Sequence, residues 1–217
     1  MAGKKGRGLL MVWTDVPADK EEEFNRWYNE EHLAELLAIP GFLDGARYEA
    51  VSGGPRYLAC YELESAEVIE SPAYRTHFDN PTPWSRRMSP RVIGINWSGN
   101  TYRQIFPEEA ASGGMAPALV TGRLSCEEAV EDQFNRWYNG VYIPGHNALP
   151  GCIRGRRYTA TRGQPKYLTV YELEHEDVVQ SAEWLANRTA HPQTLEMRKH
   201  MTHAPGSPGV YRKLFEL

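Results

Sequence analysis

Cysteine is scarce in this chain of 217 residues, which contains only three. Cys60, Cys126 and Cys152 form no closely spaced pair, and an odd number leaves one cysteine without a partner. This usage argues against a disulfide scaffold and against a cysteine-based metal site. We therefore interpret the three side chains as buried thiols.

Long hydrophobic runs and an excess of charge of one sign are also missing. The apolar run at residues 9–13 is too short for a signal sequence or a membrane span. The formal net charge is −4, with acidic and basic residues interspersed, which disfavours binding to nucleic acid. We expect a soluble cytoplasmic protein that binds neither nucleic acid nor membrane, with a frayed basic N-terminus at residues 1–8.

Motifs for phosphate binding and for nucleophilic catalysis are absent as well. No glycine-rich loop joins a strand to a helix, and no nucleophile elbow occurs. Four histidines, His77, His191, His200 and His203, suggest a metal site, but the last two lie in a Pro-rich region without carboxylates at ligand spacing. We predict neither a bound metal nor a cofactor.

What the chain does contain is an internal duplication. The hexapeptide at residues 24–29, FNRWYN, returns unchanged at residues 134–139. Without any gap, roughly 23 of the 51 positions from residue 24 to residue 74 are identical to those 110 residues later. The chain therefore divides into a first repeat at residues 1–106, a linker at 107–117 and a diverged second repeat at 118–217.

Each repeat has the pattern of an α+β unit. In the first repeat we predict a helix from the N-cap Asp19 to about residue 38, where Pro40-Gly41 ends it, and a second helix capped by Ser65. The expected strands cover residues 8–14, 41–51, 55–63 and 91–106. In the second repeat Pro144-Gly145 predicts an earlier end of the first helix.

The order of elements predicts the overall architecture. Two tandem ferredoxin-like βαββαβ units follow one another, and each sheet has one face that its own helices leave uncovered. The two antiparallel sheets are therefore expected to pack together as an α/β barrel, a pseudo-dimer completed within one chain, either as a monomer or in a further homodimer.

A motif in the first repeat resembles a known family. Residues 25–33, NRWYNEEHL, followed by Ile39-Pro40-Gly41-Phe42 and a strand with Arg47-Tyr48, are similar to EthD-like proteins of the dimeric α/β-barrel superfamily. The resemblance covers the first repeat well and the second in a degraded form. It implies a pocket for small hydrophobic or aromatic molecules between the first helix and the sheet. Relatives in this superfamily catalyse different reactions, so the fold alone does not determine the chemistry.

His32 is the first candidate for catalysis, as a general acid or base. Asn29 and Glu35 lie three residues before and after it, and helical spacing allows either side chain to orient it or the substrate. The alternative is a structural histidine, bonded to backbone or paired with Glu35. The second repeat has Tyr142 and Gly145 at the matching positions, so only the first repeat keeps this set.

Further side chains are candidates for substrate binding. Tyr28 and Trp27 lie beside His32 on the helix, although their presence in both repeats also suits a packing role. Arg47 is a candidate anchor for a carboxylate or phenolate, with an ion pair to Glu62 as the alternative. Tyr142 and His146 are the corresponding candidates of the second repeat.

Three functions follow from these candidates. The first is a cofactor-independent isomerase, dehydratase or cyclase for a small hydrophobic or aromatic metabolite, with His32 moving a proton. The second is a cofactor-free monooxygenase of electron-rich phenols, which would consume oxygen. The third is an accessory protein that binds a hydrophobic metabolite without converting it.

Overall fold

The sheet of the first repeat is built around its first strand. In the computed structural model, which describes residues 5–217, β1 (Gly8–Asp15) lies between β3 (Tyr57–Leu63) and β4 (Ile95–Phe106). Strand β2 (Phe42–Ser52) pairs with β3, which gives the order β4-β1-β3-β2. The strands predicted at residues 8–14, 41–51 and 55–63 are confirmed to within two residues at their ends.

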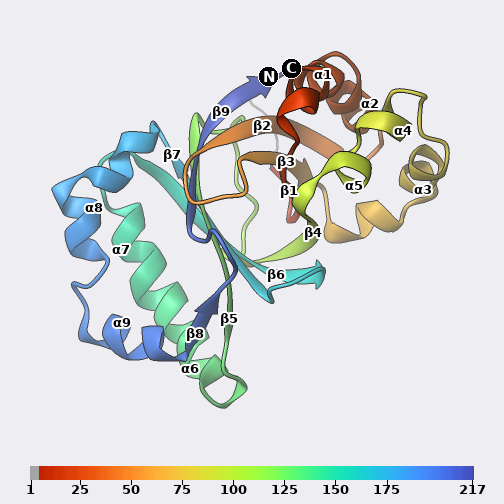
Figure 1. Cartoon of the computed structure of the whole chain (residues 1–217). Coiled ribbons are helices and arrows are strands. Elements are labelled where there is room, and N and C mark those ends of the chain that lie inside the picture. Colours follow the sequence, from red (N-terminus) through yellow and green to blue (C-terminus); the bar gives the residue numbers. More distant parts are fainter. Residues whose placement is uncertain (1–4) are drawn as a thin grey trace.

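The second repeat has the same arrangement, with its strands in the order β9-β5-β7-β6. These strands are β5 (Ala118–Cys126), β6 (Cys152–Arg162), β7 (Tyr167–Leu173) and β9 (Gly209–Glu216). Strand β2 then pairs with β9, and β4 pairs with β6, so the two sheets close into one eight-stranded antiparallel barrel (Figure 1). A short extra strand, β8 (Met201–His203), continues beyond β9 along β5.

Side chains fill the interior of the barrel. Along β1, Leu9, Met11 and Trp13 point inward and are fully buried, while Leu10 and Val12 point toward the helices. The same alternation sends Tyr48 inward and Arg47 outward from β2. A barrel of this size is packed with side chains, and two cavities lie outside it, beneath the helices.

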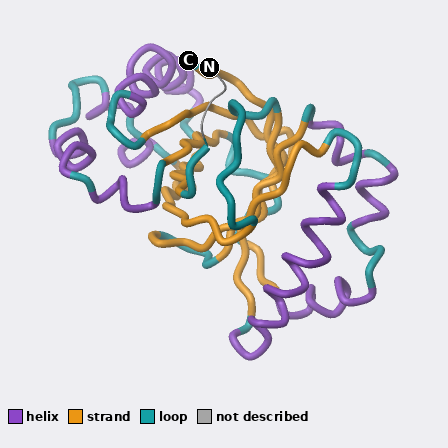
Figure 2. Tube along the Cα trace, turned by 180° about the vertical axis from the view of Figure 1, so that it is seen from behind, coloured by secondary structure: helices purple, strands orange, loops and turns teal. Residues whose placement is uncertain are grey.

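The helices cover the barrel in two groups, one for each repeat, on separate sides of the molecule (Figures 1 and 2). The first repeat contributes α1 (Glu21–Trp27), a π-helical turn (Tyr28–His32) and α2 (Leu33–Leu37), which together form one continuous helical segment. The predicted helix thus exists, but Asp19 does not cap it, because Asp19 lies within a preceding 3-10 turn (Ala18–Lys20) and accepts no cap hydrogen bond.

The predicted early end of the first helix in the second repeat is wrong. Here α6 (Glu131–Trp137), a π-helical turn (Tyr138–Tyr142) and α7 (Ile143–Asn147) match the first repeat residue for residue. Pro144 is the second residue of α7, which begins where the π turn has already interrupted the α-helical hydrogen-bond pattern. A proline there removes less hydrogen bonding than it would in a regular helix.

The second helix of each repeat starts later than predicted. Ser65 precedes a 3-10 turn (Ala66–Glu70), and the helix proper, α3 (Pro72–Asp79), is capped by Ser71, whose hydroxyl accepts from the Tyr74 amide at 3.2 Å. Residues 91–93, predicted as strand, belong to a short helix. The remaining helices are α4 (Ser85–Met88), α5 (Pro90–Ile93), α8 (Ala182–Asn187) and α9 (Pro192–Met197).

The N-terminus and the linker are tied to the barrel. Residues 1–4 of the expected frayed N-terminus lie outside the described residues, whereas Lys5 is buried and its Nζ lies 3.0 Å from Oε1 of Glu62. In the linker, Met115 and Ala116 are buried, and the Ala116 carbonyl accepts from the Tyr48 hydroxyl at 3.0 Å. Among residues 5–217, no helix has the length and apolar character that crossing a membrane requires.

Candidate functional site

A cavity of about 370 Å³ lies between the helices of the first repeat and the outer face of its sheet. Its volume falls within the range of small-molecule sites. The sheet contributes Leu10, Val12 and Tyr61 to its wall. The helical segments contribute mainly aromatic and imidazole groups, namely Trp27, Tyr28, His32, Tyr74, His77 and Phe78. We call it the first cavity.

His32 faces the first cavity with little exposure to solvent. Its ring stacks on Trp27 at a centroid distance of 4.3 Å and meets Tyr28 edge-on at 5.0 Å. The π turn makes the stacking possible, because it places residues five apart on one side of the helix. Burial lowers the pKa of His32, with His77 acting in the same direction and Glu35 opposing. The imidazole is therefore neutral at neutral pH and has a lone pair available.

Glu35 and His77 lie beside His32. Nδ1 of His32 is 3.8 Å from Oε2 of Glu35, too long for a hydrogen bond, and neither atom has a hydrogen-bond partner among residues 5–217. Ligand atoms of His32, Glu35 and His77 all lie within 4.8 Å of one another. These three side chains could hold a metal ion, an arrangement that the sequence spacing did not predict because His77 comes from a different helix.

Asn29 and Arg47 do not line the first cavity. Arg47 Nη1 donates to Oδ1 of Asn29 at 2.7 Å, and Nη2 donates to Oδ1 of Asn25 at 2.7 Å. The guanidinium also lies 4.5 Å from the ring centroid of Tyr28. Asn29 therefore accepts a hydrogen bond from strand β2. The alternative ion pair of Arg47 with Glu62 is wrong, because the two side chains point to opposite faces of the sheet.

Two phenols form the inner wall of the first cavity. Burial raises the pKa of Tyr28 and raises that of Tyr61 well above its usual value. The buried Tyr61 hydroxyl has no hydrogen-bond partner within the described chain. Neutral phenols in this position can donate hydrogen bonds to an oxygen atom of a bound ligand.

Three arginines line the first cavity, and our sequence reasoning missed all of them. Arg86 comes from α4, and its Nε donates to the Pro81 carbonyl at 3.1 Å. Arg91 comes from α5, whereas Arg162 comes from the end of β6 in the second repeat. Comparison of the two repeats could have drawn attention to Arg162, because the matching position in the first repeat is Ser52. Likewise His77 is matched by Asn187. Both differences lie outside the motif that drew attention to His32.

Tyr142 and His146 line a second cavity of about 370 Å³ in the second repeat, and the first cavity does not include them. His146 is 1% exposed, and its Nδ1 lies 2.9 Å both from the Tyr142 carbonyl oxygen and from Nδ2 of Asn187. Burial lowers the pKa of His146 to about 4. This histidine is neutral and engaged by its neighbours. It therefore differs from His32, whose Nδ1 has no partner among the described residues.

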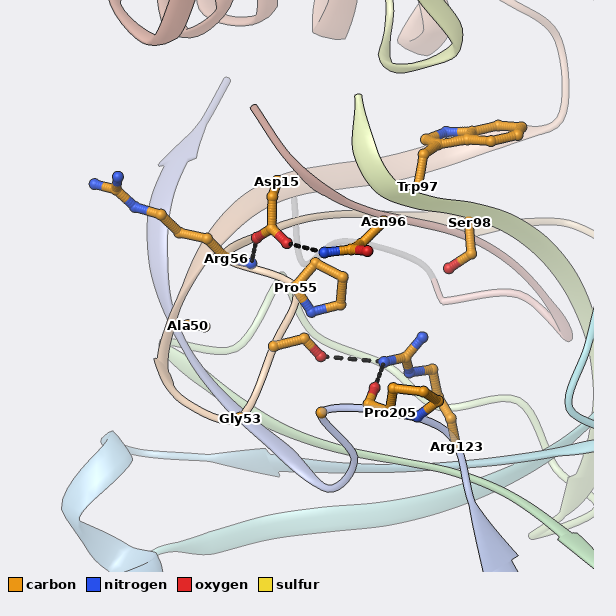
Figure 3. A pocket seen from close by; sticks show the side chains of 12 residues that line it. Asp15, Ala50, Gly53, Pro55, Arg56, Asn96, Trp97, Ser98, Arg123 and Pro205 are labelled. Carbon is orange, nitrogen blue, oxygen red and sulfur yellow. Dashed lines mark hydrogen bonds between the residues drawn. The ribbon is translucent and has the colours of Figure 1, made fainter. Parts of the chain in front are cut away.

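A third cavity, of about 700 Å³, opens at one end of the barrel (Figure 3). Its polar groups largely bond one another: Asp15 accepts from the Arg56 amide at 2.7 Å, and Nη2 of Arg123 donates to the Gly54 and Pro205 carbonyls at 3.1 and 2.8 Å. No histidine or cysteine lines this opening. It offers less for proton transfer than the first cavity.

The comparisons with known proteins agree on the architecture. No protein-family model matches the chain. A curated relative, core atranone cluster (CAC) protein 1 of Stachybotrys chlorohalonatus (strain IBT 40285), is 23% identical over 77% of this chain and 82% of its own. This level of identity does not by itself establish a family.

The solved structures show the fold. An anthrone oxidase-like protein superposes with a TM-score of 0.63 at 12% identity, covering 97% of this chain and 92% of its own. A candidate monooxygenase of Fusobacterium nucleatum gives 0.60 at 10% identity, with coverages of 97% and 94%. A dye-decolorizing peroxidase of Bacteroides thetaiotaomicron gives 0.59 at 8% identity, with coverages of 98% and 94%. The chain therefore has the dimeric α+β-barrel fold, with two ferredoxin-like units that lie in tandem and close the barrel within one polypeptide.

Proposed function

We propose that this protein is a monooxygenase that oxidises an electron-rich phenolic or anthrone-like molecule bound in the first cavity. The observation that carries the proposal is the position of His32, a neutral imidazole in the wall of an apolar, aromatic cavity. The oxidase-like and monooxygenase structures that share the fold support this reaction class over the isomerase, dehydratase or cyclase that the sequence first suggested. A fungal secondary-metabolite relative fits the same choice.

The proposed reaction begins with the removal of a proton from the substrate. His32 removes the proton of the substrate hydroxyl, or of the carbon that tautomerises to it, and the resulting anion is electron-rich enough to react with O₂. For anthrone, the ring CH₂ becomes a carbonyl: one oxygen atom of O₂ enters the product, the other leaves as water, and the substrate supplies all the electrons. In this proposal Tyr28 and Tyr61, which line the same cavity, donate hydrogen bonds to the substrate oxygen.

Glu35 and Asn29 have supporting roles in this proposal. Glu35 stabilises the imidazolium that forms when His32 takes the proton, because its carboxylate lies 3.8 Å from Nδ1. Asn29 acts through Arg47 and the helix, and so positions the site instead of touching the substrate. Trp27 holds the imidazole plane by stacking.

The test is oxygen uptake with anthrone as the probe. We expect the full chain to consume one O₂ per anthrone and to form anthraquinone, measured with an oxygen electrode and by absorbance against an enzyme-free control. His32→Gln should reduce the rate by about a hundredfold to ten-thousandfold, the usual contribution of a general base. His203→Gln, a histidine of the second cavity, serves as the matched control and should retain the wild-type rate.

Three outcomes would contradict the proposal. If His32→Gln folds normally by circular dichroism and keeps full oxygen uptake, His32 is not the base. If treatment with EDTA abolishes the activity and a divalent metal restores it, the His32, Glu35 and His77 side chains act as metal ligands instead of as a proton acceptor and its neighbours. Tight retention of anthrone without any product would favour the accessory binding protein.

A further inference from the structure

Three arginines line the first cavity, and the proposed oxidation uses none of them. Arg86 donates through Nε to the Pro81 carbonyl at 3.1 Å, which leaves Arg91 and Arg162 as the two guanidinium groups without a hydrogen-bond partner among residues 5–217. Arg91 lies in α5 of the first repeat, and Arg162 is the last residue of β6 in the second repeat. Arg162 reaches this cavity because β6 pairs with β4 at one of the two seams that close the barrel, where Arg162 lies opposite Thr101. The second repeat thus contributes a residue to the cavity of the first.

Neither guanidinium is neutralised. Among residues 5–217, no carboxylate lies within 4.0 Å of Arg91 or Arg162, and no hydrogen bond holds either side-chain head group. Burial lowers the pKa of Arg91, and the positive charge of Arg162 acts in the same direction. The two guanidinium groups therefore lie close enough to repel one another. Burial raises the pKa of Tyr74, and the positive charges of Arg91 and Arg162 both oppose this rise. An anion bound between these two positive charges would reduce the repulsion between them.

Aromatic rings hold Arg91 in place. Its guanidinium carbon lies 4.0 Å from the ring centroid of Phe78 and 5.5 Å from that of Trp97. All three side chains line the first cavity. Stacking fixes the plane of the guanidinium while leaving its N–H groups open to a ligand, which favours a planar oxygen acid that can accept two parallel hydrogen bonds.

The backbone that carries Arg162 is also anchored. Gly163 follows it with φ of +96°, a conformation that side chains with a Cβ rarely adopt. A Cβ there would lie 2.2 Å from Oδ1 of Asn100, and this same Asn100 donates through Nδ2 to the Gln164 carbonyl at 2.8 Å. The β6–β7 hairpin is therefore locked onto β4 next to the cavity.

The second cavity is also lined by two arginines, Arg188 and Arg198, but both belong to its own repeat. The hairpin of the first repeat crosses the other seam in the same way and places Ser52 in the wall of the second cavity. Ser52 matches Arg162 in the repeat alignment. The two cavities therefore have similar walls of aromatic side chains, but only the first receives an arginine across the seam.

We propose that Arg91 and Arg162 bind a carboxylate of the substrate, so that the first cavity selects aromatic acids over neutral aromatic molecules of the same shape. This inference rests on the proposed function, because it assumes that the substrate occupies this cavity. The aromatic part of the substrate lies toward His32, and the carboxylate lies at the outer part between the two repeats.

The experiment compares two probes that differ only in charge, naphthalene-2-carboxylate and naphthalene-2-carboxamide, by isothermal titration calorimetry with the full chain. We expect the carboxylate to bind at least about tenfold more tightly. Arg91→Gln and Arg162→Gln should each weaken carboxylate binding by about fivefold, because both arginines are partly exposed to solvent, and should leave carboxamide binding unchanged. The preference should also shrink at high salt.

Arg188→Gln removes an arginine from the second cavity and is the matched control, expected to change neither affinity. Equal affinities for the two probes, or arginine variants that weaken both probes alike, would overturn the inference. The outcomes also separate the two proposals. Oxygen uptake without a charge preference overturns only this inference, whereas a charge preference without oxygen uptake by the wild type overturns only the proposed oxidation.

Discussion

Arg47 shows how one buried cation can be stabilised without a carboxylate. It is 2% exposed, and its guanidinium is held by the amide oxygens of Asn25 and Asn29 and by the face of Tyr28. Burial lowers the pKa of Arg47, because removing the charged guanidinium from water costs free energy. Arg157 repeats the arrangement with Asn135 and Asn139. This explains why both asparagines of the repeated motif are present in both copies.

Replacing the acceptor tests this role. Asn29→Leu leaves a buried guanidinium N–H without a partner, so we expect the free energy of unfolding to fall by about 1–3 kcal/mol in urea denaturation. Asn139→Leu is the matched variant in the second repeat and should cost a similar amount. If only Asn29→Leu impaired oxygen uptake while both variants kept wild-type stability, Asn29 would contact the substrate instead.

At the scale of elements, the π turns and the hairpins are what distinguish this protein from two simple ferredoxin-like units. Each π turn starts at the tyrosine of the repeated motif and shifts the helix by one residue. In the first repeat this shift brings His32 over Trp27, and in the second it brings Tyr142 beside Trp137 at 4.9 Å. Helical periodicity alone could not predict the shift, because the hydrophobic pattern of a π turn differs from that of an α-helix by only one residue.

Substitution of Gly163 tests whether the β6–β7 hairpin is anchored on β4. Gly163→Ala places a methyl group against Asn100 in a backbone conformation unfavourable for alanine, so we expect a loss of stability of about 1–3 kcal/mol and weaker binding of naphthalene-2-carboxylate as Arg162 moves. Urea denaturation and calorimetry measure the two effects. The control is Gly114→Ala in the linker, where a Cβ meets nothing within 4 Å. Unchanged stability of Gly163→Ala would show that the hairpin is not locked.

At the scale of the whole molecule, a buried ionic network joins the two repeats inside the barrel. Arg156 donates through Nη1 to Oε2 of Glu62 at 3.1 Å and through Nη2 to Oε1 of Glu172 at 2.7 Å. Lys5 adds a second cation 3.0 Å from Glu62. Burial acts to raise the pKa of Glu62, but Arg156 and Lys5 outweigh it and lower the pKa.

This network predicts how stability depends on pH. Because the pKa of Glu62 is lowered in the folded state, its contribution is present above the unfolded value of about 4.3 and is lost as the pH falls toward the folded value. Glu62→Gln should reduce the free energy of unfolding by about 3–5 kcal/mol at pH 7, because Arg156 and Lys5 lose a buried partner. The difference from wild type should shrink as the pH falls below about 4.3, as urea denaturation at several pH values would measure. A constant difference would contradict the assigned pKa direction.

The sequence by itself determined the duplicated α+β units, most of their strands and the aromatic packing of the first helix, and it singled out His32, which lines the first cavity. These features depend on local periodicity, turn residues and the comparison of two copies of one motif. Pro144 was misread because local rules assume a regular helix at that point. Only the tertiary structure decided that His77 joins His32 and Glu35, and that Arg162 crosses a seam into the first cavity. The reason is physical: which strands pair when a sheet closes, and which distant side chains then meet, depends on non-local contacts that no spacing along the chain encodes.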